Sequence, residues 1–154
     1  MTPQLKSNWP LVNVSATNAG TATSQVIDTM GYDWATIDIV ATTQSASTQA
    51  GSPSVLKLQE ADNTSATSFV DIVGARGGSA TATNVDFLVG VGATATTSPN
   101  GYKFNVDLRA RKRYLQIVIS PTTTETFAAV VNLGRGEQAP TTAAKAGVLN
   151  LVEI

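Results

Sequence analysis

The stretch Tyr102-Lys-Phe-Asn-Val-Asp-Leu-Arg109 decides the fold class, because its side chains alternate between apolar and polar. The apolar members are Tyr102, Phe104, Val106 and Leu108, and the polar members are Lys103, Asn105, Asp107 and Arg109. Successive side chains of a β-strand point to opposite faces of the sheet, whereas an amphipathic helix repeats its apolar residues every three or four positions. The stretch therefore predicts a strand with one buried face.

The same alternation recurs along most of the chain, in short runs that end at Gly, Pro, Asn or Ser residues. No segment keeps a helical repeat for three turns. The expected strands are 10–15, 24–29, 33–43, 53–60, 67–74, 84–91, 101–109, 113–120, 125–134 and 147–152. Many short strands with one buried face predict an all-β fold, an antiparallel two-sheet β-sandwich of jelly-roll-like form, with a closed barrel as the alternative.

The buried face changes phase within residues 101–120. Apolar residues occupy even positions up to Leu108 and odd positions from Leu115 onward. A shift of this kind requires a turn or a bulge, because moving by one residue exchanges the two faces of a strand. We therefore expect 101–120 to form a hairpin with its tip near Ala110–Lys112.

A chain of 154 residues fits one domain, which can bury roughly 68–70% of its unfolded surface without a metal or a disulfide. Residues 13–135 are expected to form the sandwich, and residues 1–12 an irregular, polar N-terminal arm that contains Trp9. Tryptophan is common at interface hot spots. Trp9 is therefore expected either to contact another protein or to fold back over its own sandwich.

Residues 136–154 combine a linker rich in Gly, Pro, Ala and Thr with an apolar tail, Val148-Leu-Asn-Leu-Val152. An apolar segment after a linker can add a strand to a sheet. The tail is expected either to complete its own sheet or to dock on a neighbouring subunit, and in the second case Leu149 and Leu151 are interface residues.

The composition argues against catalysis, because the chain contains no cysteine and no histidine. Histidine is the commonest general base and metal ligand, and cysteine is needed for disulfides, thiolate zinc sites and thiol nucleophiles. The acidic turn Glu60–Asn63 lacks the spaced ligands of a calcium loop. We therefore expect no enzyme, no cofactor and no metal site.

The charge balance argues against nucleic acid and membrane partners. The formal net charge is −1, whereas nucleic-acid-binding proteins show a basic excess. No apolar stretch approaches the length of a membrane span, and the N-terminus lacks a signal-peptide pattern. We expect a protein made in a cytoplasm, whose weakly charged surface suits a subunit packed against others.

The densest charge lies in Arg109-Ala-Arg-Lys-Arg113. Two interpretations are open for Arg109, Arg111, Lys112 and Arg113. They either form a solvated turn that pairs with nearby Asp or Glu residues, or they anchor a protein interface. The second interpretation rests on the guanidinium group, which binds carboxylates through two parallel hydrogen bonds.

Four stretches together resemble the head decoration, or cement, proteins of tailed bacteriophages. They are Val26-Ile-Asp-Thr-Met-Gly-Tyr-Asp33, Leu56-Lys-Leu-Gln-Glu-Ala-Asp-Asn63, Asp107-Leu-Arg-Ala-Arg-Lys-Arg-Tyr-Leu115 and Ala128-Ala-Val-Val-Asn-Leu-Gly-Arg135, followed by Pro140. The resemblance extends from about residue 24 to residue 140. It implies a β-sandwich, often a homotrimer, that binds the major capsid protein over the joints between capsomers on the outside of the virion, after synthesis in the host bacterial cytoplasm.

Two other functions fit the same fold, because β-sandwiches serve many roles. One is a carbohydrate- or receptor-binding module, such as the tip of a head fibre. The other is a different virion component, such as a tail or adaptor subunit. Binding to cells or glycans, and the location of the chain on intact particles, distinguish these functions from decoration.

Overall fold

The computed structural model describes residues 4–17, 20–41, 53–78, 84–89, 100–122 and 124–135. The strands are β1 (Gln4–Ala16), β2 (Ala22–Thr23), β3 (Ile27–Asp28), β4 (Trp34–Ala41), β5 (Val55–Ala61), β6 (Val70–Gly78), β7 (Phe87–Leu88), β8 (Asn100–Asp107), β9 (Tyr114–Ser120) and β10 (Glu125–Arg135). Two short 3-10 helices, η1 (Ala66–Ser68) and η2 (Leu108–Ala110), complete the described elements. Within these ranges, no helix has the length and apolar character needed to cross a membrane.

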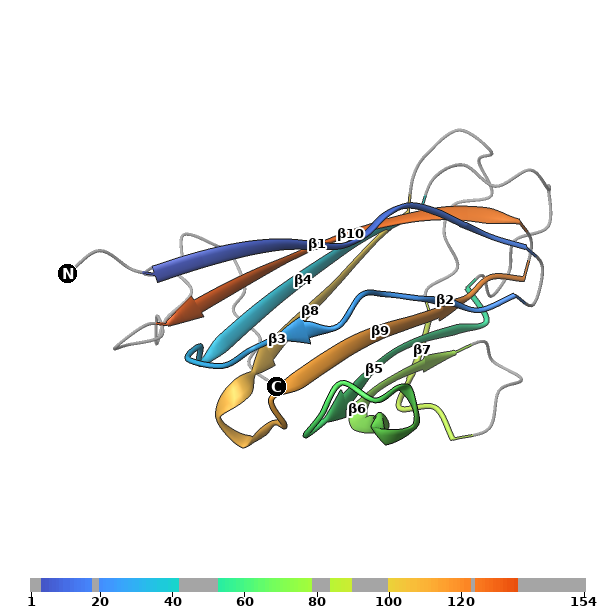
Figure 1. Cartoon of the computed structure of the whole chain (residues 1–154). Coiled ribbons are helices and arrows are strands. Elements are labelled where there is room, and N and C mark those ends of the chain that lie inside the picture. Colours follow the sequence, from blue (N-terminus) through green and yellow to red (C-terminus); the bar gives the residue numbers. More distant parts are fainter. Residues whose placement is uncertain are drawn as a thin grey trace, which may run out of the picture.

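The strands form two sheets that lie face to face (Figure 1). One sheet has the order β1-β10-β4-β8, and the other has the order β2-β9-β5-β6-β7, with β3 also paired to β9. The described pairs are antiparallel except for β6 and β7, which run parallel. The structure confirms the predicted all-β fold and its arrangement as a two-sheet sandwich.

The core fills the space between the two sheets, and alternate residues of the central strands supply it. Its fully buried members include Ile37, Ile39, Phe127, Val131 and Leu133 from the first sheet, and Leu56, Leu58, Leu115, Ile117 and Ile119 from the second. Complete burial of one such side chain stabilises the folded state by about 1.5–3 kcal/mol. The period of two in the sequence therefore reflects burial on the inner face of each sheet.

Residues 101–120 do not form the predicted hairpin. β8 pairs with β4 in one sheet, whereas β9 pairs with β5 in the other. η2 and residues 111–113 carry the chain across the sandwich, so that Leu108 and Leu115 reach the core from opposite sides. The prediction was wrong because a phase shift marks a change of buried face, which a crossing between sheets also produces.

The N-terminal residues are not the irregular arm that the sequence predicted for residues 1–12. From Gln4 onward the chain is a strand, β1, which pairs with β10 along its whole length. Two register shifts, between Asn8 and Leu11 and between Leu11 and Val14, interrupt the pairing. Bulges of this kind break the alternation of side chains. The strand therefore has no clear period of two in the sequence.

Other strand boundaries differ from the predicted ones at the edges of the sheets. Of the predicted strand 24–29, only β3 (Ile27–Asp28) is a strand, and the short strand β2 lies just before the predicted range. Of the predicted strand 84–91, only Phe87–Leu88 is a strand within the described residues. The predicted strand 147–152 and the tail that contains Leu149 and Leu151 lie outside the described residues.

Candidate functional site

The basic cluster lies at one end of the sandwich, where segments far apart in the sequence meet. The crossing between β8 and β9 lies there beside the end of β5 and the turn between β3 and β4 (Figure 1). We call this region the charged end, defined by Asp28, Glu60, Asp62, Asp107, Arg109, Arg111, Lys112 and Arg113. It brings together all four basic residues that the sequence singled out.

Arg113 and Arg109 each bind a carboxylate in the two-pronged geometry that the guanidinium group favours. The Nε and Nη2 atoms of Arg113 donate to Asp28 at 2.9 and 2.7 Å. Arg109 donates from the same two atoms to Asp107, at 2.9 and 2.6 Å. An aromatic ring supports each guanidinium, because Arg113 lies 4.8 Å from the Tyr114 ring and Arg109 lies 5.3 Å from that of Trp34.

Arg111 and Lys112 attach the crossing to the end of β5. The Nη1 atom of Arg111 lies 3.6 Å from Glu60, whose side chain is only 14% exposed. The backbone N–H of Lys112 donates to the same carboxylate at 3.1 Å, and its ammonium group lies 3.1 Å from Asp62. Glu60 therefore holds the crossing through both a side chain and the backbone.

Each of the four basic side chains has an acidic partner within the same chain. Four cationic and four acidic groups cancel in formal charge, so the charged end is not an open basic patch. The sequence had offered this paired turn as one of two interpretations, and the geometry of the described residues matches it. The interface role of the cluster stays a prediction, and the side chains of Arg109 and Arg113 keep 64% and 45% of their surface exposed.

Loss of these ion pairs at acid pH is expected to destabilise the fold. The Arg113 hydrogen bond lowers the pKa of Asp28 from 3.8 to about 2, and the Arg109 hydrogen bond lowers that of Asp107 to about 2. A carboxyl whose pKa is lowered by folding stabilises the native state above its unfolded pKa, and this contribution disappears as the pH falls through the folded value. As the pH is lowered from about 4 to about 2, the midpoint temperature of thermal unfolding should therefore decrease. In the variant with Asp28→Asn and Asp107→Asn, the midpoint temperature should decrease less over the same pH range. An equal decrease in the variant and the wild-type protein would show that these two ion pairs do not cause the acid sensitivity.

Trp9 lies on β1, at the edge of the four-stranded sheet, and 64% of its surface is exposed. It is not folded back over the core, which was one of the two expectations. Val12 on the same strand is 65% exposed. The carbonyl of Pro10 accepts a hydrogen bond of 3.0 Å from Gln25, which attaches β1 to the segment between β2 and β3. An exposed indole is thus presented on a strand that is held from both sides.

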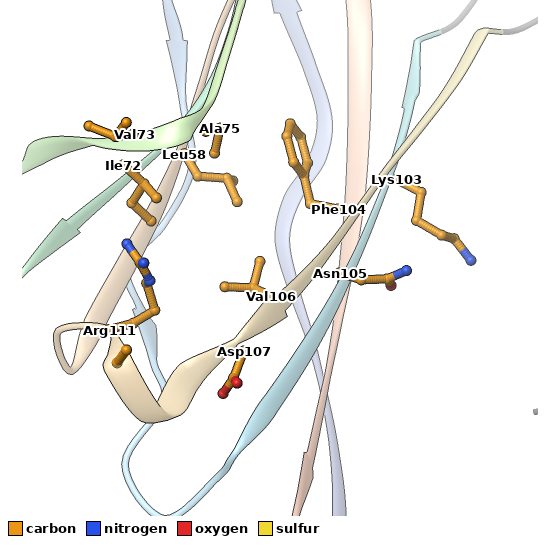
Figure 2. A pocket seen from close by; sticks show the side chains of 12 residues that line it. Leu58, Ile72, Val73, Ala75, Lys103, Phe104, Asn105, Val106, Asp107 and Arg111 are labelled. Carbon is orange, nitrogen blue, oxygen red and sulfur yellow. The ribbon is translucent and has the colours of Figure 1, made fainter. Parts of the chain in front are cut away.

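A cleft of about 540 Å³ opens between β6 and β8, which belong to different sheets. Figure 2 shows Phe104 and Val106 on the inner side of β8, facing Leu58 and Ile72. Lys103 and Asn105 point to the other side of the strand, as its alternation requires (Figure 2). The side chains of β5, β6 and β8 that face the cleft are consequently apolar, and Arg111 extends toward it from the crossing (Figure 2). The sequence alone does not locate this cleft, because the residues that line it come from strands whose order the sequence does not give.

Chemically, the described side chains offer ion pairs and apolar contacts. Within the described ranges, no group of three or more acidic side chains is placed to hold a metal ion. No protein-family model matches the sequence, and no curated protein sequence is detectably similar to it.

Proposed function

We propose that the protein decorates the head of a tailed bacteriophage, where it binds the outer capsid surface and stabilises the contacts between capsomers. The observation that carries this proposal is the meeting of all four phage-like stretches at the charged end. Asp28 pairs there with Arg113, and Glu60 with Arg111. The fourth stretch joins them through Gly134, whose carbonyl accepts a hydrogen bond of 3.0 Å from Asp33. The resemblance is thus carried by one contiguous structural unit.

The order of the strands gives further support, because we infer from it that the sandwich is a jelly roll. If β2 and β3, which both pair with β9, are counted as one strand, and the two-residue strand β7 beside β6 is set apart, each described sheet has four strands. Of the described connections, only β5 to β6 then stays within one sheet, and the others cross between sheets. Jelly rolls occur in viral capsid proteins and also in lectins.

The proposed mechanism is mechanical. A protein that binds assembled capsomers, and not separated ones, shifts the equilibrium toward the assembled head by mass action. An oligomer that touches several capsomers gains avidity, and the homotrimer implied by the resemblance has such symmetry. Trp9 and Val12 on β1 are the proposed apolar contacts, and Arg109 and Arg113 are the proposed polar rim of the interface.

The proposal is tested on intact particles of the phage that encodes the chain. Mass spectrometry should find the chain in purified virions, and labelled antibody should locate it on the head. Heads that lack the protein should lose their DNA at a lower temperature, and added protein should restore the wild-type value. A chain absent from virions, or located on the tail, would contradict decoration and favour the alternative of a tail or adaptor subunit.

The cleft between β6 and β8 is the feature that favours the alternative of a carbohydrate- or receptor-binding module. Its volume is in the range of small-ligand sites, which need a few polar groups aimed inward. Phe104 and Val106 face the interior, Lys103 and Asn105 point away from it, and Arg111 extends toward it (Figure 2). A glycan array and a cell-binding assay with purified protein decide between the two functions, because specific attachment would favour the module.

A further inference from the structure

One wall of the cleft between β6 and β8 is a bulge in β6. The pairs that flank the bulge are Lys57 with Arg76, and Gln59 with Asp71. Between these pairs, Leu58 on β5 lies opposite residues 72–75 of β6. Ile72 is buried in the bulge, whereas its neighbour Val73 is 76% exposed. A bulged strand bends away from its partner. The extra length of β6 therefore shapes the cleft.

The bulge is fixed by the carboxylate of Asp86. Gly74 has a φ of +92°, a conformation that glycine adopts without strain. The backbone N–H groups of Gly74 and Arg76 donate to Asp86 at 2.7 and 3.1 Å. The guanidinium of Arg76 donates to the same carboxylate at 2.9 and 2.7 Å. These hydrogen bonds hold the bulge in place, so this wall of the cleft is formed before any ligand binds.

The opposite wall is apolar and only partly buried. Phe104 and Val106 on β8 pack against the core but keep part of their surface exposed. The ring of Phe104 meets that of Phe87 edge to face, with 5.9 Å between the ring centroids. The side chains of these residues and of Ile72 neither donate nor accept hydrogen bonds, which a buried sugar would need. They suit a hydrocarbon body.

The polar group at the cleft is Arg111, which extends toward it from the crossing (Figure 2). Its Nη1 atom lies 3.6 Å from Glu60, whereas the other three ion pairs of the charged end measure 2.6–3.1 Å. Glu60 also accepts a backbone hydrogen bond of 3.1 Å from Lys112. A guanidinium carries five N–H donors in a rigid fork. Arg111 can therefore bind a second carboxylate while Glu60 keeps its backbone donor.

We propose that the cleft binds a small amphipathic anion, a carboxylate with a short hydrocarbon body. The body lies between the bulge of β6 and the side chains of Phe104 and Val106, and the carboxylate binds Arg111. The volume of about 540 Å³ lies within the range of about 300–1,000 Å³ that small-ligand sites occupy. This inference does not depend on the proposed virion role.

Titration of the full chain with octanoate tests the proposal, because octanoate has this chemistry and stays monomeric in solution. Two control ligands keep the same hydrocarbon chain, since 1-octanol lacks the charge and octylammonium reverses it. Octanoate should bind about tenfold more tightly than 1-octanol, because hydrogen bonds between charged groups are the stronger ones. Octylammonium should bind most weakly. Equal affinities for the three ligands, or no saturable binding of octanoate, would overturn the proposal.

The methyl signals in the NMR spectrum locate the bound octanoate. Those of Ile72 and Val106 should shift during the titration, because they line the cleft. The methyl groups of Val40 should not, because Val40 is 42% exposed and points to the outer face of β4. Shifts of similar size at all three residues would show binding to apolar surface in general and would contradict a site in the cleft.

The variant Arg111→Gln tests the polar contact. It should lower the affinity for octanoate about tenfold and leave that for 1-octanol unchanged. The matched control is Lys103→Gln, which removes a cation from β8 whose side chain points away from the cleft (Figure 2). An equal loss of octanoate affinity in both variants would indicate a general effect of charge and exclude Arg111 as the anchor.

The variant Ala75→Leu tests the apolar contact, because the larger side chain occupies the cleft from the side of the bulge. It should weaken the binding of octanoate and 1-octanol alike, by about tenfold or more, while the thermal midpoint shows that the chain still folds. The control is Val70→Leu, on the same strand before the bulge, where the residue is 50% exposed. Unchanged binding in a folded Ala75→Leu variant would place the ligand elsewhere.

Discussion

Replacing Phe127 by alanine is expected to lower the free energy of unfolding by about 3–5 kcal/mol. The side chain is 0% exposed and belongs to β10, which lies between β1 and β4. Its backbone pairs with Val14 on one side and with Ala41 on the other. Truncation leaves a cavity between the two sheets, and the pairing of β10 on both sides limits how far its backbone can move to fill it.

Urea unfolding measures this effect, with Val40→Ala as the control. Val40 is on β4, one strand away from β10, but it is 42% exposed and points to the outer face. Its truncation should cost about 0.5 kcal/mol or less, as is usual for surface positions. If both variants lost similar stability, the assignment of the inner face of β10 would be wrong.

The local pattern of the sequence is sufficient to predict most strands, because burial on one face imposes a period of two on the side chains. Tyr102, Phe104 and Val106 were expected on the inner face of their strand, and the structure places them there. The pattern does not show whether a strand is central or at an edge. Whether a strand is central or at an edge depends on the strand order. This order explains why Phe104 borders a cleft, whereas Ile37 is fully buried.

The connections and the ion pairs were less predictable, because they depend on contacts between distant residues. The phase shift between Leu108 and Leu115 is visible in the sequence, but it is compatible with a hairpin and with a crossing between sheets. The partner of Arg113 is Asp28, which is 85 residues away in the sequence. The density of arginine suggested carboxylate partners, and only the fold identifies which acids approach them.

Replacing Trp9 by alanine is expected to weaken binding to phage heads about 30-fold, if the proposed function holds. A hot-spot tryptophan contributes about 2 kcal/mol or more to an interface, and about 1.4 kcal/mol corresponds to a tenfold change in affinity. Trp9 is the largest exposed apolar side chain among the described residues, and it lies on an edge strand. The indole is therefore the side chain best placed to fill a pocket on a partner.

Sedimentation of labelled protein with heads measures the affinity, and Leu88→Ala is the matched control. Leu88 is 62% exposed, nearly the same as the 64% of Trp9, but it is on β7 at the edge of the other sheet. Both changes remove exposed apolar surface, so a general loss of non-specific apolar binding would affect the two variants equally. Because 64% of the Trp9 side chain is already in solvent, its loss should change the thermal midpoint little. A selective loss of head binding in Trp9→Ala would then assign the β1 edge to the capsid contact, whereas equal affinities for both variants would exclude Trp9 from it.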